Sequence, residues 1–182
     1  MMFPTEKTFK PDQYLGLSVE KPEIPDFVRH VANENHLNEK PECHISVLVS
    51  NNAVQAWRTA ASASDPEMMR GKIQELFNSY AWEYSLTSEY FLHEHTYTKD
   101  ELVANGEDVP EHTRRSIVVK VSLPDLSRFY EKLNEMLGLS LPLPVPHVTL
   151  FAWSDYEPYR VRGIGICSRE EFDRFTKQKI TP

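Results

Sequence analysis

Thirteen prolines are spread along the 182 residues, and they limit the length of every regular element that the chain can form. Proline lacks a backbone N–H, fixes its own φ and disfavours helical geometry at the residue before it. Every second residue of the segment 141–146 is a proline, so this segment is predicted to be extended and not helical. We therefore expect a series of short elements with prolines between them.

Between the prolines, apolar residues recur with the periods that distinguish strands from helices. Alternating or β-branched residues predict strands over 14–19, 43–50, 82–95, 116–123, 147–153 and 159–166. Helical spacing predicts helices after Asp26, twice within 53–80, after Asp125 and after Ser168. The polar segment 96–114 is predicted to be a mobile loop. This order indicates an α+β fold with antiparallel or mixed sheets that helices cover on one side.

The composition indicates one globular domain, because 40% of the residues are hydrophobic and 26% are charged. We divide the chain into an N-terminal arm, residues 1–11, and a single domain, residues 12–182. The formal net charge of −7 argues against broad binding to duplex DNA, which requires a basic face. It is compatible with a small anionic substrate in a locally basic cleft.

The sequence has no run of about 18 apolar residues, so we expect no membrane span. The first residues lack the apolar core of a signal peptide, and we expect a cytoplasmic monomer. Cys43 and Cys167 are the only cysteines and are predicted to be free thiols. Two cysteines cannot form a structural zinc site without help from histidine.

Two of the predicted strands carry the same unusual pattern, His44-Ile-Ser46-Val in the first and His147-Val-Thr149-Leu in the second. Residues i and i+2 of a strand share a face, so His44 lies on the same face as Ser46, and His147 on the same face as Thr149. The aliphatic residues between them face the core. If the two strands border a common cleft, that cleft contains two imidazoles and two hydroxyls.

Such a set of side chains is suited to acid–base catalysis. A neutral imidazole takes the proton of an attacking oxygen, and an imidazolium gives a proton to the leaving oxygen. The unperturbed pKa of histidine, about 6.5, suits both tasks. Hydroxyl groups donate hydrogen bonds to phosphoryl oxygens as negative charge develops on them.

The two motifs resemble those of the two-histidine (2H) phosphoesterase superfamily, which includes 2′-5′ RNA ligase-like proteins and cyclic phosphodiesterases. That family has one His-x-Thr/Ser-hydrophobic motif in each lobe of a pseudo-twofold α+β fold. Residues 146–150 resemble its second motif in nearly standard form, and residues 43–47 resemble its first, with Ser46 where threonine is commoner. The resemblance covers most of residues 12–167. It implies two pseudo-symmetric lobes of sheet, with outer helices, around a central cleft.

The resemblance also implies cleavage or formation of ribose phosphodiester bonds without a metal or another cofactor. The expected substrates are 2′,3′-cyclic nucleotides, 2′-5′ linkages or RNA ends. By the same resemblance, His44 and His147 are the acid–base pair, and Ser46 and Thr149 hold the phosphate. The family does not indicate which histidine is the acid.

Further candidates for substrate binding come from arginine and aromatic side chains. Guanidinium groups pair well with phosphate oxygens, and aromatic rings stack on bases. The sequence offers two arginine pairs, Arg114 with Arg115 and Arg160 with Arg162, of which the second is predicted to share one face of a strand. Phe151 has the same parity as His147 and Thr149, so we expect it to face the same cleft.

Two other functions remain open at this stage. The chain could be a nucleotide-binding or RNA-binding module of the same fold without turnover, because such a module also keeps the histidines. Alternatively, His93 and His95 lie at a spacing that can ligate a metal, which would indicate a metal hydrolase. The sequence shows no third ligand for that metal.

Overall fold

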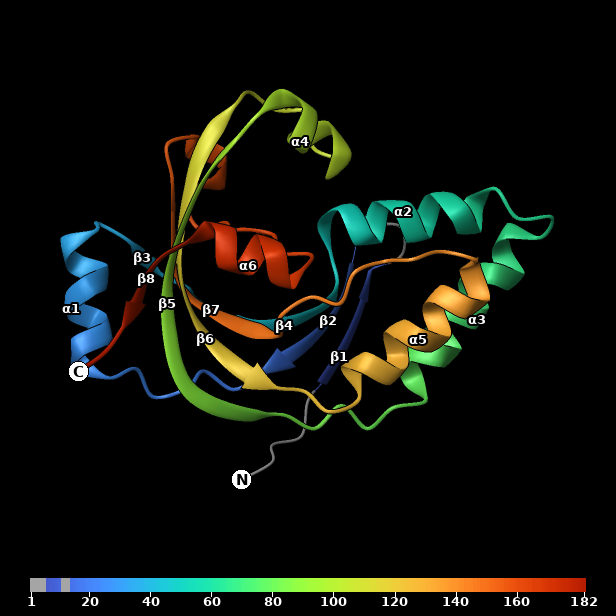
Figure 1. Ribbon diagram of the computed structural model, residues 1–182, viewed down its shortest axis with the longest axis horizontal. Coiled ribbons are helices and arrows are strands. Elements are labelled where there is room, and N and C mark those ends of the chain that lie inside the picture. Colours follow the sequence, from blue (N-terminus) through green and yellow to red (C-terminus); the bar gives the residue numbers. More distant parts are fainter. Residues whose placement is uncertain (1–5, 11–13) are drawn as a thin grey trace.

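A computed structural model describes residues 6–10 and 14–182 of the chain (Figure 1). The strands of this part are β1 (Glu6–Lys10), β2 (Tyr14–Val19), β3 (Asn38–Glu39), β4 (Cys43–Leu48), β5 (Ser85–Tyr97), β6 (His112–Ser122), β7 (His147–Ser154) and β8 (Thr176–Ile180). The helices are α1 (Asp26–Glu34), α2 (Ser50–Ala61), α3 (Pro66–Asn78), α4 (Lys99–Ala104), α5 (Leu126–Leu137), α6 (Arg169–Phe175) and the short 3₁₀ helix η1 (Glu157–Tyr159).

The strands form one sheet in the order β1-β2-β4-β7-β6-β5-β8, and β3 pairs with β7 beside this path. All of the pairings in the described part of the chain are antiparallel. Figure 1 shows that the sheet is strongly curved at β5 and β6. The predicted α+β class with an antiparallel sheet is thus confirmed. The two pseudo-symmetric lobes that the resemblance implies stay a prediction.

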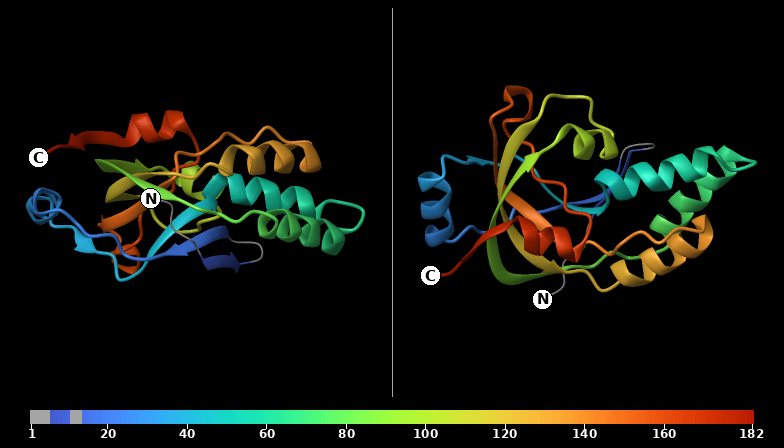
Figure 2. Two further views of the ribbon diagram at one scale, coloured as in Figure 1. Left: turned by 90° about the horizontal axis from the view of Figure 1, so that it is seen from below. Right: turned by 45° about the horizontal axis from the view of Figure 1, so that its top comes forward.

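The helices α2, α3 and α5 gather at one end of the molecule, and α1 lies at the other end (Figures 1 and 2). Helix α5 forms as the sequence predicts, with Phe129 and Leu133 buried on one face and Gly138 in the left-handed conformation at its end (φ 64°). Phe129 lies 5.5 Å from the ring of Trp82, which donates a hydrogen bond to the Phe77 carbonyl. These aromatic rings form part of the larger core.

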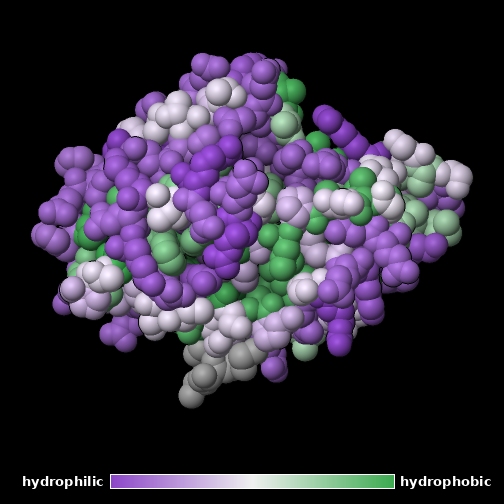
Figure 3. All heavy atoms as spheres, in the orientation of Figure 1, coloured by the Kyte–Doolittle hydropathy of each residue, from purple (hydrophilic) through white to green (hydrophobic). Residues whose placement is uncertain are grey.

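A second apolar cluster lies beneath α6. Phe172 and Phe175 of α6 pack there with Val118 of β6 and with Ile164 and Ile166. Ser168 accepts a hydrogen bond from the Glu171 N–H and thereby caps α6, as its sequence predicts. Polar side chains cover most of the face shown in Figure 3. Most of the buried apolar side chains of the described residues gather in these two clusters.

The strand predicted over 159–166 is absent. Pro158 lies inside η1, and the chain then continues without regular structure to Ser168. The backbone N–H of Ile164 donates to the Ser116 hydroxyl, and that of Gly165 donates to the Tyr97 hydroxyl. Side chains therefore satisfy the hydrogen bonds that a neighbouring strand would have supplied.

The segment 96–114 is also more ordered than predicted. Strand β5 continues to Tyr97, helix α4 occupies residues 99–104, and β6 begins at His112. Thr98 and Glu101 form a complete capping box at the start of α4. Apart from Thr98, only the connection 105–111 lacks regular structure, so the prediction of a long mobile loop was wrong.

Three terminal or boundary predictions need correction. Residues 6–10, expected in an irregular arm, form β1 and pair with β2, while residues 1–5 and 11 of that arm lie outside the described residues. The strand predicted from residue 82 begins at Ser85, because Trp82 has a left-handed backbone (φ 57°). The sequence analysis missed β8, which pairs with β5 after α6.

Candidate active site

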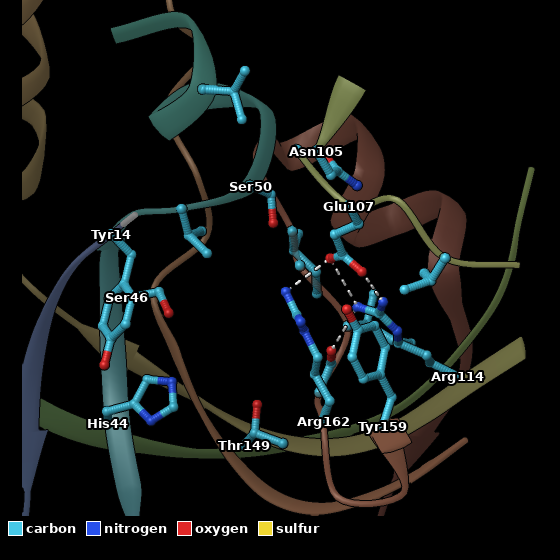
Figure 4. A pocket seen from close by; sticks show the side chains of 18 of the residues that line it. Tyr14, His44, Ser46, Ser50, Asn105, Glu107, Arg114, Thr149, Tyr159 and Arg162 are labelled. Atoms are coloured by element: carbon cyan, nitrogen blue, oxygen red, sulfur yellow. Dashed lines mark hydrogen bonds and ion pairs between the residues drawn. The ribbon is translucent and has the colours of Figure 1, made fainter. Parts of the chain in front are cut away.

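A cleft of about 720 Å³ opens on the sheet where β4 and β7 meet (Figure 4). His44, Ser46, His147 and Thr149 all line it. The other walls come from β2, the start of α2, the connection after α4, β6 and the segment 159–166. The structure therefore brings both sequence motifs to one cavity, whose size is in the range of small-molecule sites, about 300–1,000 Å³.

The register of the sheet explains this convergence. Ile45 of β4 is paired with Val148 of β7, and both side chains are fully buried in the larger core. His44 and Ser46 flank Ile45, just as His147 and Thr149 flank Val148. Since neighbours along a strand face opposite sides of a sheet, all four polar side chains turn away from the core and toward the cleft.

The half-buried imidazole of His147 is held in one orientation by its own backbone. Its Nδ1 lies 2.8 Å from the carbonyl oxygen of Val145. A carbonyl only accepts hydrogen bonds, so Nδ1 carries the proton and the neutral ring has its lone pair on Nε2. Burial lowers the pKa of His147 below its usual value, and the bond to Val145 offsets only part of this effect. His147 is therefore suited to start the reaction as a neutral base.

His44 has different surroundings. Its side chain is exposed to solvent at the edge of the cleft, and its ring lies 6.2 Å from that of Tyr14. Figure 4 shows His44 and Ser46 on the same wall, with Thr149 at the base of the cleft. The two imidazoles thus differ in burial, which separates the two roles that acid–base catalysis needs.

The wall opposite His44 carries a compact group of charges. Glu107 is buried and forms ion pairs with Arg114 and with Arg162, whose Nη2 lies 2.9 Å from its carboxylate. Arg114 is 2% exposed. Both guanidinium groups also lie over the ring of Tyr159, at 4.8 Å and 4.4 Å from its centroid. These contacts fix the arginines in place before any ligand binds.

Positive charge exceeds negative charge around the cleft. Lys40 also lines it, donates to the Val161 carbonyl at 2.8 Å and has its pKa lowered by burial. The other lining carboxylate besides Glu107 is Asp108, which is exposed and paired with Lys99 outside the cleft. Glu107 neutralises one of the three lining cations, and the charge of Asp108 is shared with Lys99. The remaining positive charge favours an anionic ligand, although the whole chain is acidic.

Glycines give the cleft its close packing around the hydroxyl groups. A Cβ at Gly163 would lie 3.2 Å from Thr149 Oγ1, and one at Gly165 would lie 2.0 Å from Ser50 Oγ. Ser50 itself has a left-handed backbone (φ 51°) where β4 leads into α2. Strained non-glycine residues of this kind cluster at functional sites. The absence of side chains at Gly163 and Gly165 thus lets this segment lie close to Thr149 and Ser50.

Three residues predicted to bind substrate lie outside this cleft. Phe151 is buried in the larger core, because a bulge in β7 opposite Ile117 and Val118 reverses its parity relative to Thr149. Arg115 forms an ion pair with Glu94 and lies over the ring of Trp153. Arg160 is exposed and pairs with Glu157 in the turn that replaced the predicted strand. Arg114 and Arg162 remain as the arginines that line the cleft.

His93 and His95 are each engaged by other partners. His93 is fully buried, and its Nε2 lies 3.0 Å from the Thr176 hydroxyl. His95 bonds to Glu101 at 3.2 Å and stacks on Phe175 with 4.0 Å between ring centroids. Among the residues that the structure describes, no group of three or more His, Cys, Asp or Glu side chains could hold a metal ion.

The sequence analysis missed several residues of the cleft, namely Tyr14, Lys40, Ser50 and Glu107. None of them belongs to a motif. Each lies at the cleft only because the fold brings its segment next to the two motif strands. Tyr14 reaches the cleft because its strand pairs with the strand of His44, which the structure shows and no local sequence pattern indicates. The two cysteines are buried free thiols, as predicted.

Comparisons with protein-family models, with curated proteins and with solved structures found no match for this chain. Within residues 6–10 and 14–182, none of the helices has the length and apolarity needed to cross a membrane.

Proposed function

We propose that this protein is a phosphoesterase that cleaves a ribose phosphodiester by two-histidine acid–base catalysis without a metal. The observation that carries the proposal is the meeting of His44-x-Ser46 and His147-x-Thr149 at one cleft. The resemblance of both motifs to those of 2H phosphoesterases supports the same chemistry. The substrate classes are a 2′,3′-cyclic nucleotide, a 2′-5′ linkage or an RNA end.

The surroundings of the two histidines suggest the division of roles. His147 presents the Nε2 lone pair of a neutral ring, because Nδ1–H donates to the Val145 carbonyl and burial lowers the pKa. It takes the proton of the attacking oxygen. His44 is exposed and can take up a proton from solvent before it protonates the leaving oxygen.

The hydroxyl groups of Ser46 and Thr149 lie beside these imidazoles and donate hydrogen bonds to the phosphoryl oxygens. The excess of positive charge from Lys40, Arg114 and Arg162 holds the anionic substrate in the cleft.

A panel assay tests this function. The wild type and His147→Ala are incubated with 2′,3′-cyclic nucleotides, 2′-5′ oligonucleotides and 3′-5′ RNA ends, each with and without EDTA. His30→Ala is the matched control, because His30 is an exposed imidazole on α1 away from the cleft. We expect cleavage by the wild type and by His30→Ala, unaffected by EDTA, and loss of cleavage in His147→Ala.

The other outcomes distinguish the alternatives. Binding of a nucleotide without turnover of any substrate would indicate a non-catalytic binding module. Loss of activity in EDTA, with rescue by a divalent ion, would contradict the metal-independent mechanism. Full activity of His147→Ala would contradict the role of that residue as the base.

A further inference from the structure

A second groove, of about 550 Å³, adjoins the cleft on the side of β2. It is lined by Tyr14, Gly16, Ser18, Val19, Lys21 and residues 41–44. Tyr14 and His44 line the cleft and the groove alike. His44 therefore stands between two cavities, and only the first of them contains Ser46, His147 and Thr149.

The pairing of β2 with β4 builds this groove as a continuation of the same sheet face. Ser18 is paired with His44, and Gly16 is paired with Ser46, so these residues share the face that carries the motif. Their small size leaves the face open. The ring of Tyr14 lies against Gly16, where an added Cβ would be 2.8 Å from Tyr14 Cε2. Small residues of β2 thus line the groove, and the aromatic ring of Tyr14 lies at its boundary with the cleft.

We propose that this groove holds the nucleoside attached to the leaving oxygen. The substrate class would then be a linear ribonucleoside phosphodiester with a nucleoside on each side of the scissile phosphate. This inference rests on the proposed function, and it selects a linear linkage over a cyclic mononucleotide as the preferred substrate.

The reaction exchanges one phosphorus–oxygen bond for another. The ribose hydroxyl next to the phosphate attacks phosphorus, and its proton passes to Nε2 of His147. The bond from phosphorus to the oxygen of the second nucleoside breaks, and that oxygen takes a proton from His44. The products are a nucleoside cyclic phosphate, which stays in the cleft, and a second nucleoside with a free hydroxyl, which leaves from the groove.

The position of His44 connects the groove with this chemistry. A general acid must lie within hydrogen-bond reach of the leaving oxygen, so the leaving group extends past His44. In a cyclic mononucleotide the leaving oxygen belongs to the same ribose, which needs no second cavity. The groove has a volume suited to a small molecule, and the Tyr14 ring provides a face on which a base stacks.

A matched pair of substrates isolates the groove. The first is the dinucleotide ApA, as both the 2′-5′ and the 3′-5′ isomer, and the second is the corresponding methyl ester of adenosine monophosphate. Both undergo the same attack and release an alcohol, but only the dinucleotide has a nucleoside to place in the groove. We expect kcat/KM of the wild type to be at least about tenfold higher for the preferred dinucleotide, equivalent to about 1.4 kcal/mol.

A variant tests whether that preference arises in the groove. Ser18→Phe fills the groove with a ring at a position that does not line the cleft. Because Ser18 is paired with His44, the new ring also lies beside the proposed acid, so the readout is the ratio of kcat/KM for the dinucleotide to kcat/KM for the methyl ester. We expect this ratio to fall to about one in the variant, whereas any rate loss that the ring causes at His44 applies to both substrates and cancels in the ratio. The control is Ser122→Phe, which adds the same ring at an exposed strand position that lines neither cavity.

The outcomes separate the inference from the function on which it rests. Equal kcat/KM for the dinucleotide and the methyl ester in the wild type would overturn the inference and leave the phosphoesterase intact. A loss of preference in Ser122→Phe as large as that in Ser18→Phe would also overturn it. Cleavage of none of these substrates, nor of 2′,3′-cyclic AMP, would overturn the proposed function and the inference together.

Discussion

His147 and His44 show how identical side chains acquire different chemistry from their surroundings. The ring of His147 is half-buried and bonded to its own backbone, whereas that of His44 is exposed. This difference follows from the course of the chain before β7, because the buried Val145 presents its carbonyl to the His147 ring. It supports the assignment of His147 as base and of His44 as acid in the proposed reaction.

The first prediction concerns the dependence of the rate on pH. Burial lowers the pKa of His147 below 6.5, so its neutral form persists at more acidic pH than that of a free imidazole. The rate against pH should be bell-shaped, with the midpoint of the acidic limb below pH 6.5. The two apparent pKa values belong to the pair of histidines. Measurement of kcat/KM from pH 4 to 9 checks this, and a flat profile or an acidic midpoint above 6.5 would contradict it.

The second prediction concerns the hydroxyl groups. Ser46→Ala and Thr149→Ala each remove one hydrogen bond to the phosphate but leave both proton transfers intact. We expect each to lower kcat by less than either histidine-to-alanine change, which should cost about 10²-fold or more. Steady-state kinetics of the four variants on one substrate checks the order. A hydroxyl variant as slow as the histidine variants would assign that hydroxyl a role in proton transfer.

At the scale of helices and strands, an element could be predicted from the sequence where the interactions that form it join residues close together in the chain. The apolar spacing and the left-handed glycine of α5 act within a few residues, so the sequence predicts this helix well, although Asp125 makes no side-chain capping hydrogen bond. The segment 159–166 has strand-like residues, but side chains from β5 and β6 bind its backbone, which no local pattern could indicate. Likewise, the bulge in β7 that turns Phe151 into the core arises from pairing with β6.

The residues of the candidate site also divide into those that a local sequence pattern indicates and those that only the fold brings together. The two motifs could be found because a strand places residues i and i+2 on one face wherever it lies. Glu107 could not be found, since its importance comes from ion pairs with Arg114 and with Arg162, and Arg162 is 55 residues away in the sequence. Helix α4 could have been predicted from the sequence, because Thr98 and Glu101 have the spacing of a capping box.

The third prediction tests the fit between the segment 163–166 and the start of α2. Gly165→Ala places a Cβ 2.0 Å from Ser50 Oγ, so one of the two segments must shift. We expect lower kcat/KM and lower thermal stability. Adding Ser50→Gly should restore both, because it removes the collision and glycine tolerates the positive φ at that position.

The control for this prediction is Gly71→Ala. Gly71 lies in α3, and an added Cβ there meets nothing within 4 Å. This change should leave activity unchanged and stabilise the helix by about 0.5–1 kcal/mol. Gly165→Ala with wild-type activity and stability would show that the cleft does not depend on this close packing.

For the whole molecule, the buried His93 makes stability sensitive to acid. Burial lowers its pKa to about 3, so this residue is neutral in the folded protein and takes up a proton on unfolding below pH 6.5. The free energy of unfolding is therefore highest, as far as His93 is concerned, above pH 6.5, and it decreases as the pH falls from 6.5 toward 3. This is the fourth prediction.

The comparison uses urea denaturation of the wild type and of His93→Phe at pH 7 and pH 5. A phenylalanine fits the aromatic surroundings of Phe91 and Phe172 and does not titrate. Between these pH values the wild type should lose on the order of 2 kcal/mol more unfolding free energy than the variant. An equal loss in both proteins would show that His93 does not cause the acid sensitivity.

The central claim is that β4 and β7 bring two histidines together as one catalytic unit. A double-mutant cycle of His44→Ala and His147→Ala, with kcat measured on the best substrate of the panel, tests it most directly. Each single variant should lose about 10²-fold or more, and the double variant should lose far less than the product of the two, because either loss already disables the unit. Losses that multiply, or full activity in either single variant, would contradict the account.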